Sequence, residues 1–206
     1  SFDNAGQFCY RVNRIYVGRN LYQAFVERFA AAARALKVGD GLTPGSQMGP
    51  LVNAAGLRKT QAHVQDALQK GAHLVAGGER LTGPDYDRGF FWPPTVLADT
   101  DHSMLVMTEE TFGPVVGIMP VDSLDEAILR ANDSRYGLAA YVFTRDLAAA
   151  LRAAEQVEAG SVWVNGIHRS YNQVPFGGMK ESGLGREKSA YGLEEYLELK
   201  TIYLSL

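Results

Sequence analysis

Short apolar runs alternate with amphipathic stretches along most of the chain, and this alternation limits the folds open to it. Residues 115–121, 139–143 and 161–164 have the length and composition of buried strands. Between them, residues 124–131 and 147–157 carry apolar side chains at the three- and four-residue spacing of a helix face. Strands and helices that alternate in this way form a mainly parallel sheet covered by helices. We therefore predict an α/β fold with a mainly parallel sheet flanked by helices.

The N-terminal half is predicted to follow the same scheme. Its expected elements are a strand at residues 14–17, a helix from Asn20 to about Leu36, a second helix after Asn53 that ends at Gly71, a buried strand at residues 72–76, an extended segment at residues 90–97 and a helical turn at residues 103–106. Asparagine, serine and aspartate favour the N-cap position, so Asn20, Asn53, Ser123 and Asp146 are predicted to cap the four helices. The side chains expected to face the core from the first two helices are Leu21, Phe25, Phe29, Ala32, Leu36, Leu57, Val64 and Leu68.

The C-terminal part ends on a different pattern. A glycine-rich loop after Pro175 precedes a short helix predicted at residues 189–196. Residues 199–206 then alternate like an edge strand, which presents unpaired backbone groups and apolar side chains. Proteins seldom leave such an edge uncovered, so this segment is predicted to be a covered edge strand, with a frayed tail as the alternative.

Composition excludes several classes of protein. The 206 residues are 46 % hydrophobic, enough for a full core, and the net charge of −3 comes without any basic block. No run approaches the roughly 20 apolar residues of a membrane-spanning helix, and the N-terminus has no signal-peptide pattern. The single cysteine, Cys9, allows no internal disulfide, which is typical of a reducing compartment. We expect a cytoplasmic protein that binds neither nucleic acid nor a membrane.

Cys9 ends the stretch Asn4-Ala5-Gly6-Gln7-Phe8-Cys9. A thiol reacts as the thiolate, which backbone N–H groups and neighbouring cations favour, and Arg11 and Arg14 are close in sequence. Gly6 lets the backbone approach a substrate closely. The residues allow two interpretations, namely a reactive nucleophile or an inert thiol in the core, since free cysteine is among the most buried residue types.

A second candidate site lies at Glu109-Glu110-Thr111-Phe112-Gly113-Pro114-Val115. An ionised carboxylate is a pure acceptor and can take both hydroxyls of a ribose. An aromatic face beside it could pack on a nicotinamide ring. The alternative is a solvated helix end next to a core phenylalanine.

The loop after residue 165 carries further candidates. Phe176 stands beside Gly177-Gly178, where it could line a substrate site or fill an ordinary turn. Gly183-x-Gly185 lacks the preceding strand and spacing of a dinucleotide loop. His168 and Arg169 are interpreted as solvated loop residues unless a substrate contacts them. No histidines share the spacing of metal ligands, so no metal site is predicted.

Three of these segments together resemble the NAD(P)-dependent aldehyde dehydrogenase superfamily, in the expected order and over essentially the whole chain. They are Asn4-Ala5-Gly6-Gln7-x-Cys9, Glu109-Glu110-Thr111-Phe112-Gly113-Pro114-Val115 and the stretch from Pro175-Phe176-Gly177-Gly178 to Gly185-Arg186-Glu187. The resemblance implies that Cys9 is the nucleophile, that Glu110 binds the nicotinamide ribose and that Phe112 packs beside the ring. It also implies that Phe176 lines the aldehyde tunnel, with Phe8 and Arg169 as further substrate-binding candidates.

The resemblance implies a mechanism and an architecture. The Cys9 thiolate would attack an aldehyde, hydride would pass to NAD or NADP, and water would hydrolyse the resulting thioester to the acid. No cofactor loop and no upstream general-base glutamate are found in the chain, which we expect to be a fragment. Residues 1–198 would be the catalytic domain, separated from the protein's own N-terminal cofactor domain. Residues 199–206 would be an oligomerisation strand of a homodimer or homotetramer, with Arg186 and Glu198 in an interface ion-pair network.

Within that superfamily the chain most resembles bacterial succinate-semialdehyde dehydrogenases, with two departures. The carboxylate-binding arginine of those enzymes, six positions before the nucleophile, is Asp3 here, and a second cysteine two positions after it is Arg11. An acidic Asp3 would repel a substrate carboxylate, for which Arg11 or Arg169 would have to compensate. The expected substrate is a small aldehyde, with succinate semialdehyde as one candidate. The alternative function is a non-catalytic interaction or oligomerisation domain with Cys9 as an inert core thiol.

Overall fold

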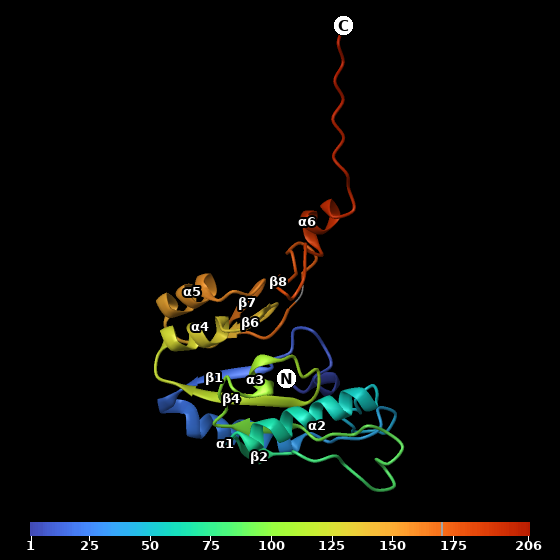
Figure 1. Cartoon of the computed structure of the whole chain (residues 1–206), viewed down its shortest axis with the longest axis vertical. Helices are drawn as coiled ribbons and strands as arrows, with labels where there is room; N and C mark the ends of the chain where they lie inside the picture. Colours follow the sequence, from blue (N-terminus) through green and yellow to red (C-terminus); the bar gives the residue numbers. More distant parts are fainter. Residues whose placement is uncertain (170) are drawn as a thin grey trace. The chain divides into compact units, whose positions relative to one another are not determined.

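The computed structural model describes residues 1–169 and 171–206, and the chain divides into two compact units, Ser1–Arg130 and Ala131–Leu206. The first unit contains a single-turn segment at Asp3–Gly6 followed by β1 (Arg14–Gly18), α1 (Arg19–Ala35), α2 (Ala54–Gln69), β2 (His73–Ala76), β3 (Thr95–Ala98), α3 (Leu105–Thr108) and β4 (Val115–Val121). Helix α4 (Leu124–Asn132) begins in this unit and ends in the second (Figure 1).

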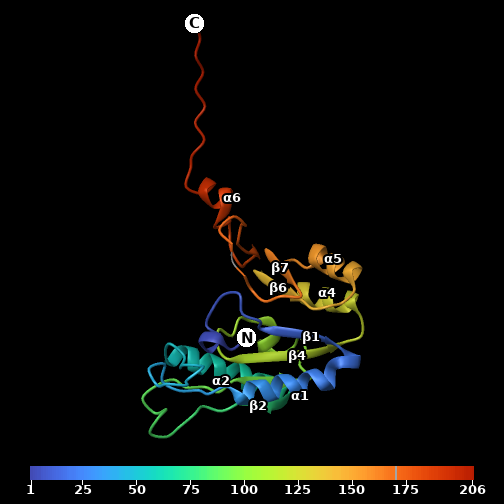
Figure 2. The same cartoon turned by 180° about the vertical axis from the view of Figure 1, so that it is seen from behind.

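A four-stranded sheet in the order β1-β4-β3-β2 forms the centre of the first unit. The pairs β1–β4 and β3–β4 are parallel, and only β2 at the edge runs antiparallel to its neighbour β3. Helix α2 lies in front in Figure 1 and α1 in front in Figure 2, which views the chain from behind, so helices cover both faces. The prediction of a mainly parallel sheet flanked by helices is confirmed for this unit.

The core lies where β3 and β4 cross the middle of this sheet. Every residue of β3 is buried, and so are most residues of β4, which makes both strands continuous apolar runs of the kind that parallel sheets need. Trp92 is buried beside them and its indole N–H donates to Thr95 Oγ1 at 2.9 Å. Its one polar atom is therefore satisfied inside the core.

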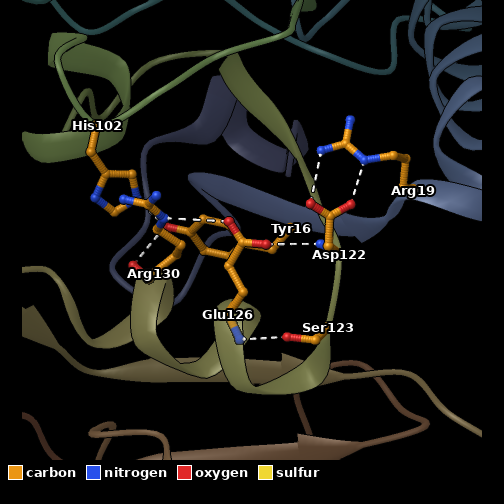
Figure 3. Close-up of polar contacts among 7 residues, drawn as sticks. All are labelled: Tyr16, Arg19, His102, Asp122, Ser123, Glu126 and Arg130. Carbon is orange, nitrogen blue, oxygen red and sulfur yellow. Dashed lines mark hydrogen bonds and ion pairs between the residues drawn. The ribbon is translucent and has the colours of Figure 1, made fainter.

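Helix α4 is capped and anchored by side chains of the first unit (Figure 3). Ser123 Oγ accepts from the backbone N–H of Glu126 at 3.1 Å, which confirms the predicted cap. At the other end of the helix, the Tyr16 hydroxyl donates to the carbonyl of Arg130 at 3.0 Å. Strand β1 thus holds the last turn of α4 within this unit.

The second unit contains short strands and helices. They are β5 (Tyr136–Gly137), β6 (Ala139–Val142), α5 (Leu147–Gln156), β7 (Ser161–Val164), β8 (Met179–Lys180) and α6 (Ser189–Glu194). Strands β6 and β7 pair in parallel, and β5 and β8 pair antiparallel. Asp146 Oδ1 accepts from the N–H of Ala149 at 3.1 Å, so the predicted cap of α5 is confirmed.

Several predictions about the helices of the first unit are wrong in detail. Helix α1 starts at Arg19 directly after β1, so Asn20 lies inside it and caps nothing. Its buried stripe is Val26, Ala30 and Ala33, whereas Leu21 and Ala32 are exposed. The predicted Phe25, Phe29 and Leu36 are half-buried and pack against the core, so that part of the predicted face is confirmed. The N-cap at Asn53 is confirmed, since its Oδ1 accepts from the N–H of Gly56 at 2.9 Å.

Burial was also predicted for two parts of the chain that the structure leaves exposed. Leu68 of α2 is exposed, and the strand predicted as buried at residues 72–76 is the edge strand β2, where His73 and Leu74 are exposed. Residues 199–206 form no strand within the single chain, and all of their side chains are exposed. A strand needs a partner for its backbone groups, so the pairing of this segment with a neighbouring subunit stays a prediction.

Candidate functional site

The Cys9 loop, residues 2–10, combines a buried base with an exposed thiol. Phe2 is buried and its ring lies 5.8 Å from that of Phe29 on α1, and Ala5 is buried as well. Cys9 is free and exposed. The alternative in which Cys9 is an inert core thiol is therefore wrong in its premise, because the loop buries Phe2, Ala5 and Gly6 and leaves the thiol exposed.

The backbone of this loop is strained. Asn4, Ala5 and Gly6 all have positive φ angles, at 50°, 54° and 70°. Such angles cost a residue other than glycine roughly 1–2 kcal/mol, so two of the three carry a cost that surrounding contacts must offset. Non-glycine strain of this kind clusters at functional sites, which supports a role for the loop.

Gln7 supplies the contacts that hold the loop. Its Nε2 donates to the carbonyls of Asn4 at 3.0 Å and Pro50 at 3.2 Å, and its Oε1 accepts from the N–H of Val52 at 2.8 Å. One side chain therefore closes the strained turn on itself and fastens it to a segment more than forty residues away. This role of Gln7 is not predictable from local spacing, and its place between Gly6 and Cys9 is the one signal in the sequence.

The Glu110 loop, residues 109–114, has the same combination of an exposed face and a buried base. Glu110 is exposed and Phe112 is 38 % exposed, whereas Thr111 between them is fully buried. Phe112 has a positive φ of 52°. The alternative of a core phenylalanine beside a solvated helix end is wrong, because the left-handed backbone at Phe112 places Thr111 inside and both of its neighbours outside.

The structure brings these two loops together. A Cβ atom added to Gly6 would lie 2.4 Å from the carbonyl oxygen of Gly113, so the two backbones touch where only glycine fits. Asn13, just after the Cys9 loop, donates through Nδ2 to the carbonyls of Val106 at 3.0 Å and Glu109 at 3.3 Å. The exposed thiol and the exposed carboxylate thus lie on two loops of the first unit that contact each other and are joined by hydrogen bonds.

Arg11 and Arg14 also donate hydrogen bonds to the segments around the Glu110 loop. The Arg11 guanidinium is 9 % exposed and donates to Asn13 Oδ1 at 2.9 Å and to the Val115 carbonyl. Burial lowers the pKa of Arg11 to about 10, against the opposing effect of Glu110, so it stays charged at neutral pH. Arg14 donates to the Met107 carbonyl at 3.4 Å. The expectation that Arg11 compensates for a substrate carboxylate is wrong, since its donors face the core.

Of the remaining site residues, Phe8 is half-buried in the first unit, and Phe176 and Arg169 belong to the second. Phe176 is half-buried in a row of aromatic contacts, 6.0 Å from the ring of His168, which itself lies 5.0 Å from the ring of Trp163. His168 is therefore packed and not a solvated loop residue as interpreted from the sequence. Burial and the nearby Lys188 lower the pKa of His168. Arg169 is exposed, as are most of its described neighbours.

Two negative findings apply to the described ranges, 1–169 and 171–206. No three His, Cys, Asp or Glu side chains gather there in a way that could hold a metal ion. No helix in those ranges has the length and apolar content needed to cross a membrane. Within the same ranges Arg186 donates to the carbonyls of Gly178 at 2.9 Å and Gly185 at 2.7 Å, so in the single chain it braces its own loop.

Comparisons with known proteins agree with the motifs. The model of the aldehyde dehydrogenase family matches residues 1–202. The chain is 48 % identical over 200 residues to a succinate semialdehyde dehydrogenase of Acinetobacter baylyi, covering 97 % of this chain and 40 % of that protein. It is 45 % identical over 203 residues to a 3-sulfolactaldehyde dehydrogenase of Pseudomonas putida, covering 98 % and 41 %.

Solved structures of similar proteins have the same fold. Over 98 % of this chain and 40 % of the other, HpcC from Thermus thermophilus superposes with a TM-score of 0.93 at 40 % identity. A betaine aldehyde dehydrogenase of Staphylococcus aureus, solved in complex with NAD+, superposes with a TM-score of 0.90 at 38 % identity over 94 % and 38 %. The chain spans about two fifths of the length of the curated relatives it matches. Over that span it belongs to the aldehyde dehydrogenase family.

Proposed function

We propose that the full-length protein oxidises an aldehyde to a carboxylic acid with NAD or NADP, and that residues 1–198 are its catalytic domain. The observation that carries this proposal is the exposed Cys9 on a strained loop whose backbone touches the loop of Glu110 and Phe112. The names of the relatives, all aldehyde dehydrogenases, support the same reaction class.

Cys9 is the proposed nucleophile. Its Sγ adds to the carbonyl carbon of the aldehyde, which gives a thiohemiacetal and an oxygen that carries negative charge until it is protonated. The N–H of Cys9 has no acceptor among the described residues, so it can donate to that oxygen. After the carbon has lost its hydride the acyl group stays on Sγ as a thioester, and water releases it as the acid and restores the thiol.

Glu110 and Phe112 fit the nicotinamide riboside part of the cofactor. An exposed carboxylate can accept hydrogen bonds from ribose hydroxyls, and the exposed ring of Phe112 offers an apolar face two residues away. The bound nicotinamide supplies the hydride acceptor for the reaction. The dinucleotide's other contacts belong, in this proposal, to an N-terminal cofactor domain that is the partner of this chain.

The proposed substrate is a small aldehyde, with succinate semialdehyde as the first candidate because a relative of nearly half identical sequence is named for it. Asp3 is exposed near the start of the Cys9 loop and would repel a second carboxylate on the substrate. Phe8, Phe176 and Arg169 are the side chains proposed to contact the substrate. Of these, Phe8 packs against the ring of Tyr10 with centroids 4.8 Å apart.

The test is the activity of the full-length enzyme with NAD and with NADP. Aldehyde-dependent production of NADH or NADPH is expected, and Glu110→Gln is expected to slow it while Cys9 still reacts with a thiol reagent at the wild-type rate. No aldehyde-dependent reduction of either cofactor would overturn the proposal. Residues 1–206 alone are expected to reduce neither cofactor at a measurable rate, although an ester could still react with Cys9.

A substrate series separates the aldehyde classes. Succinate semialdehyde and an uncharged aldehyde of the same chain length are compared for wild type and for Asp3→Asn. Removal of the Asp3 charge is expected to lower the KM for the semialdehyde and to leave the uncharged aldehyde unaffected. Equal changes for both substrates would remove Asp3 from the substrate site.

A further inference from the structure

One face of α2 holds the segment that carries Glu110. Thr60, His63 and Asp66 follow one another at three-residue intervals, so each side chain neighbours the next on the helix surface. Asp66 Oδ2 accepts from the N–H of Leu105 at 2.7 Å, at the start of the helix that leads into the Glu110 loop. A methyl group on Gly113 would lie 2.3 Å from Thr60 Oγ1, so α2 also touches the far end of that loop.

His63 contacts the middle of the loop. Its Nδ1 lies 3.0 Å from Thr111 Oγ1, and the two residues are 5 % and 0 % exposed. Thr111 stands between Glu110 and Phe112, both of which point outward. A hydrogen bond at Thr111 therefore fixes the residue about which the two exposed side chains are arranged.

The His63–Thr111 bond is a side-chain hydrogen bond from α2 to the buried middle of the Glu110 loop. Thr60 Oγ1 is buried and has no hydrogen-bond partner in the described part of the chain, and Asp66 binds α3. Phe112 has a left-handed backbone conformation, which is unfavourable for phenylalanine and must be stabilised by contacts of the loop. A buried polar pair of this kind specifies one conformation when it is satisfied.

Burial favours the neutral form of His63. Burial lowers the pKa of His63 and Lys59 on its own helix lowers it further, whereas Glu109 of the loop and Asp66 of the helix raise it. The net direction is downward. A neutral imidazole can pair with the threonine hydroxyl without placing an unpaired charge in the core.

We propose that His63 is a positioning residue, which holds the Glu110 loop through Thr111 in the conformation that presents Glu110 and Phe112 to the cofactor. The inference rests on the proposed function, because it assumes that these two side chains contact the nicotinamide riboside. His63 itself touches no reacting atom in this account.

The experiment uses the full-length enzyme and removes the bond from either side. Thr111→Val replaces the hydroxyl by a methyl group of the same shape, and His63→Leu removes the ring nitrogen, whereas His63→Asn keeps a polar atom near the position of Nδ1. Thr100→Val is the matched control, since Thr100 is equally buried in the same unit and its hydroxyl contacts Met107 Sδ at 3.3 Å. The readouts are the KM for NAD or NADP, the KM for the aldehyde, kcat and the rate at which Cys9 is alkylated without cofactor.

Thr111→Val and His63→Leu are each expected to raise the cofactor KM roughly fivefold, the factor that corresponds to about 1 kcal/mol. The double variant should be no worse than the more impaired single variant, because both remove the same bond. His63→Asn should recover part of the loss. The aldehyde KM and the alkylation rate should stay within about a factor of two of wild type, as they should for Thr100→Val.

A cofactor KM unchanged by Thr111→Val, or an alkylation rate that falls in parallel with it, would overturn the positioning role. Glu110→Gln tells this failure from a failure of the proposed function. If Glu110→Gln impairs the cofactor KM and Thr111→Val does not, only the role of His63 is wrong. If neither variant changes it, the assignment of Glu110 to the cofactor is wrong as well.

Discussion

The site loops and the C-terminal segment are both exposed, but they differ in what holds them. The Cys9 loop is fixed by the three hydrogen bonds of Gln7 and the contact between Gly6 and Gly113, and the Glu110 loop is fixed by Asn13 and His63. Residues 199–206 are exposed throughout and make no hydrogen bond with any other described residue. One surface is polar and held in place, and the other is apolar and unsupported.

This difference indicates two kinds of partner. A surface that is fixed in a strained conformation before any ligand binds suits a small molecule, whose reaction needs groups held in place in advance. An apolar segment with open backbone groups suits a protein chain, which can cover the side chains and pair with the backbone together.

The largest expected effect is on catalysis. Cys9→Ser in the full-length enzyme should lower kcat by several orders of magnitude and leave the melting temperature unchanged, because the thiol is exposed and supports no packing. Steady-state kinetics and thermal melting measure the two effects. Retention of more than about a tenth of kcat, a loss below roughly 1.4 kcal/mol, is incompatible with a nucleophile at Cys9.

The contact between the Cys9 loop and the Glu110 loop is tested at Gly6. In Gly6→Ala the new methyl would meet the Gly113 carbonyl at 2.4 Å, and overpacking of this kind costs about 1–3 kcal/mol. The left-handed backbone at φ 70° adds roughly 1–2 kcal/mol. We expect a lower melting temperature and slower alkylation of Cys9.

Gly45→Ala is the control for Gly6. Its φ is 88° and no atom lies within 4 Å of the added methyl, so only the backbone term applies. Gly45→Ala should lower the melting temperature less and leave the alkylation rate unchanged. Equal effects of the two substitutions would mean that the contact between the two loops contributes nothing.

The unsupported segment is tested by deletion. Removal of residues 199–206 should lower the mass of the assembly measured by light scattering, from a homodimer or homotetramer to a smaller species. The reaction of Cys9 with a thiol reagent should be unaffected, because residues 199–206 make no backbone hydrogen bond to the rest of the described chain. Glu198→Lys should weaken assembly and activity in the same direction. An intact protein that is monomeric, or a deletion that leaves the mass unchanged, contradicts the assignment.

The smallest expected effect is a pH dependence of the folding stability that arises from His63. The folded chain lowers the pKa of His63 through burial and Lys59, whereas the unfolded chain takes up the proton at the ordinary value near 6.5. The unfolded state therefore binds more protons below about pH 6.5, and stability falls as the pH is lowered through that range until the folded state is protonated as well. The melting temperature of the wild type should fall more between about pH 7.5 and 5.5 than that of His63→Asn. Identical pH profiles would remove His63 from this linkage.

Local patterns predicted the elements whose causes are local. Strands β4 and β7 have the bounds that their apolar runs indicated, and Asn53, Ser123 and Asp146 cap the helices that follow them. A capping side chain and its N–H donor lie three residues apart, so the sequence contains both partners of the interaction. The mainly parallel sheet followed from the same patterns.

Contacts between distant segments were not predictable in the same way. Nothing in the sequence near Asn13 indicates carbonyl partners at Val106 and Glu109, and nothing near His63 indicates Thr111. The exposure of Leu21 and of the edge strand β2 also depends on which neighbours the fold supplies. The hydrophobic pattern of residues 199–206 predicts a covered edge strand but does not identify the segment that would cover it.

In the proposed reaction the exposed thiol of Cys9 forms the covalent bond to the substrate. Full-length enzyme mixed with aldehyde and NAD or NADP, and acid-quenched within the first turnover, should carry one acyl group of the substrate, and peptide mass spectrometry should find it on Cys9. The acyl group should disappear on longer incubation as the acid is released. Turnover in which no acyl group forms on Cys9, or in which it forms on another residue, would contradict the account.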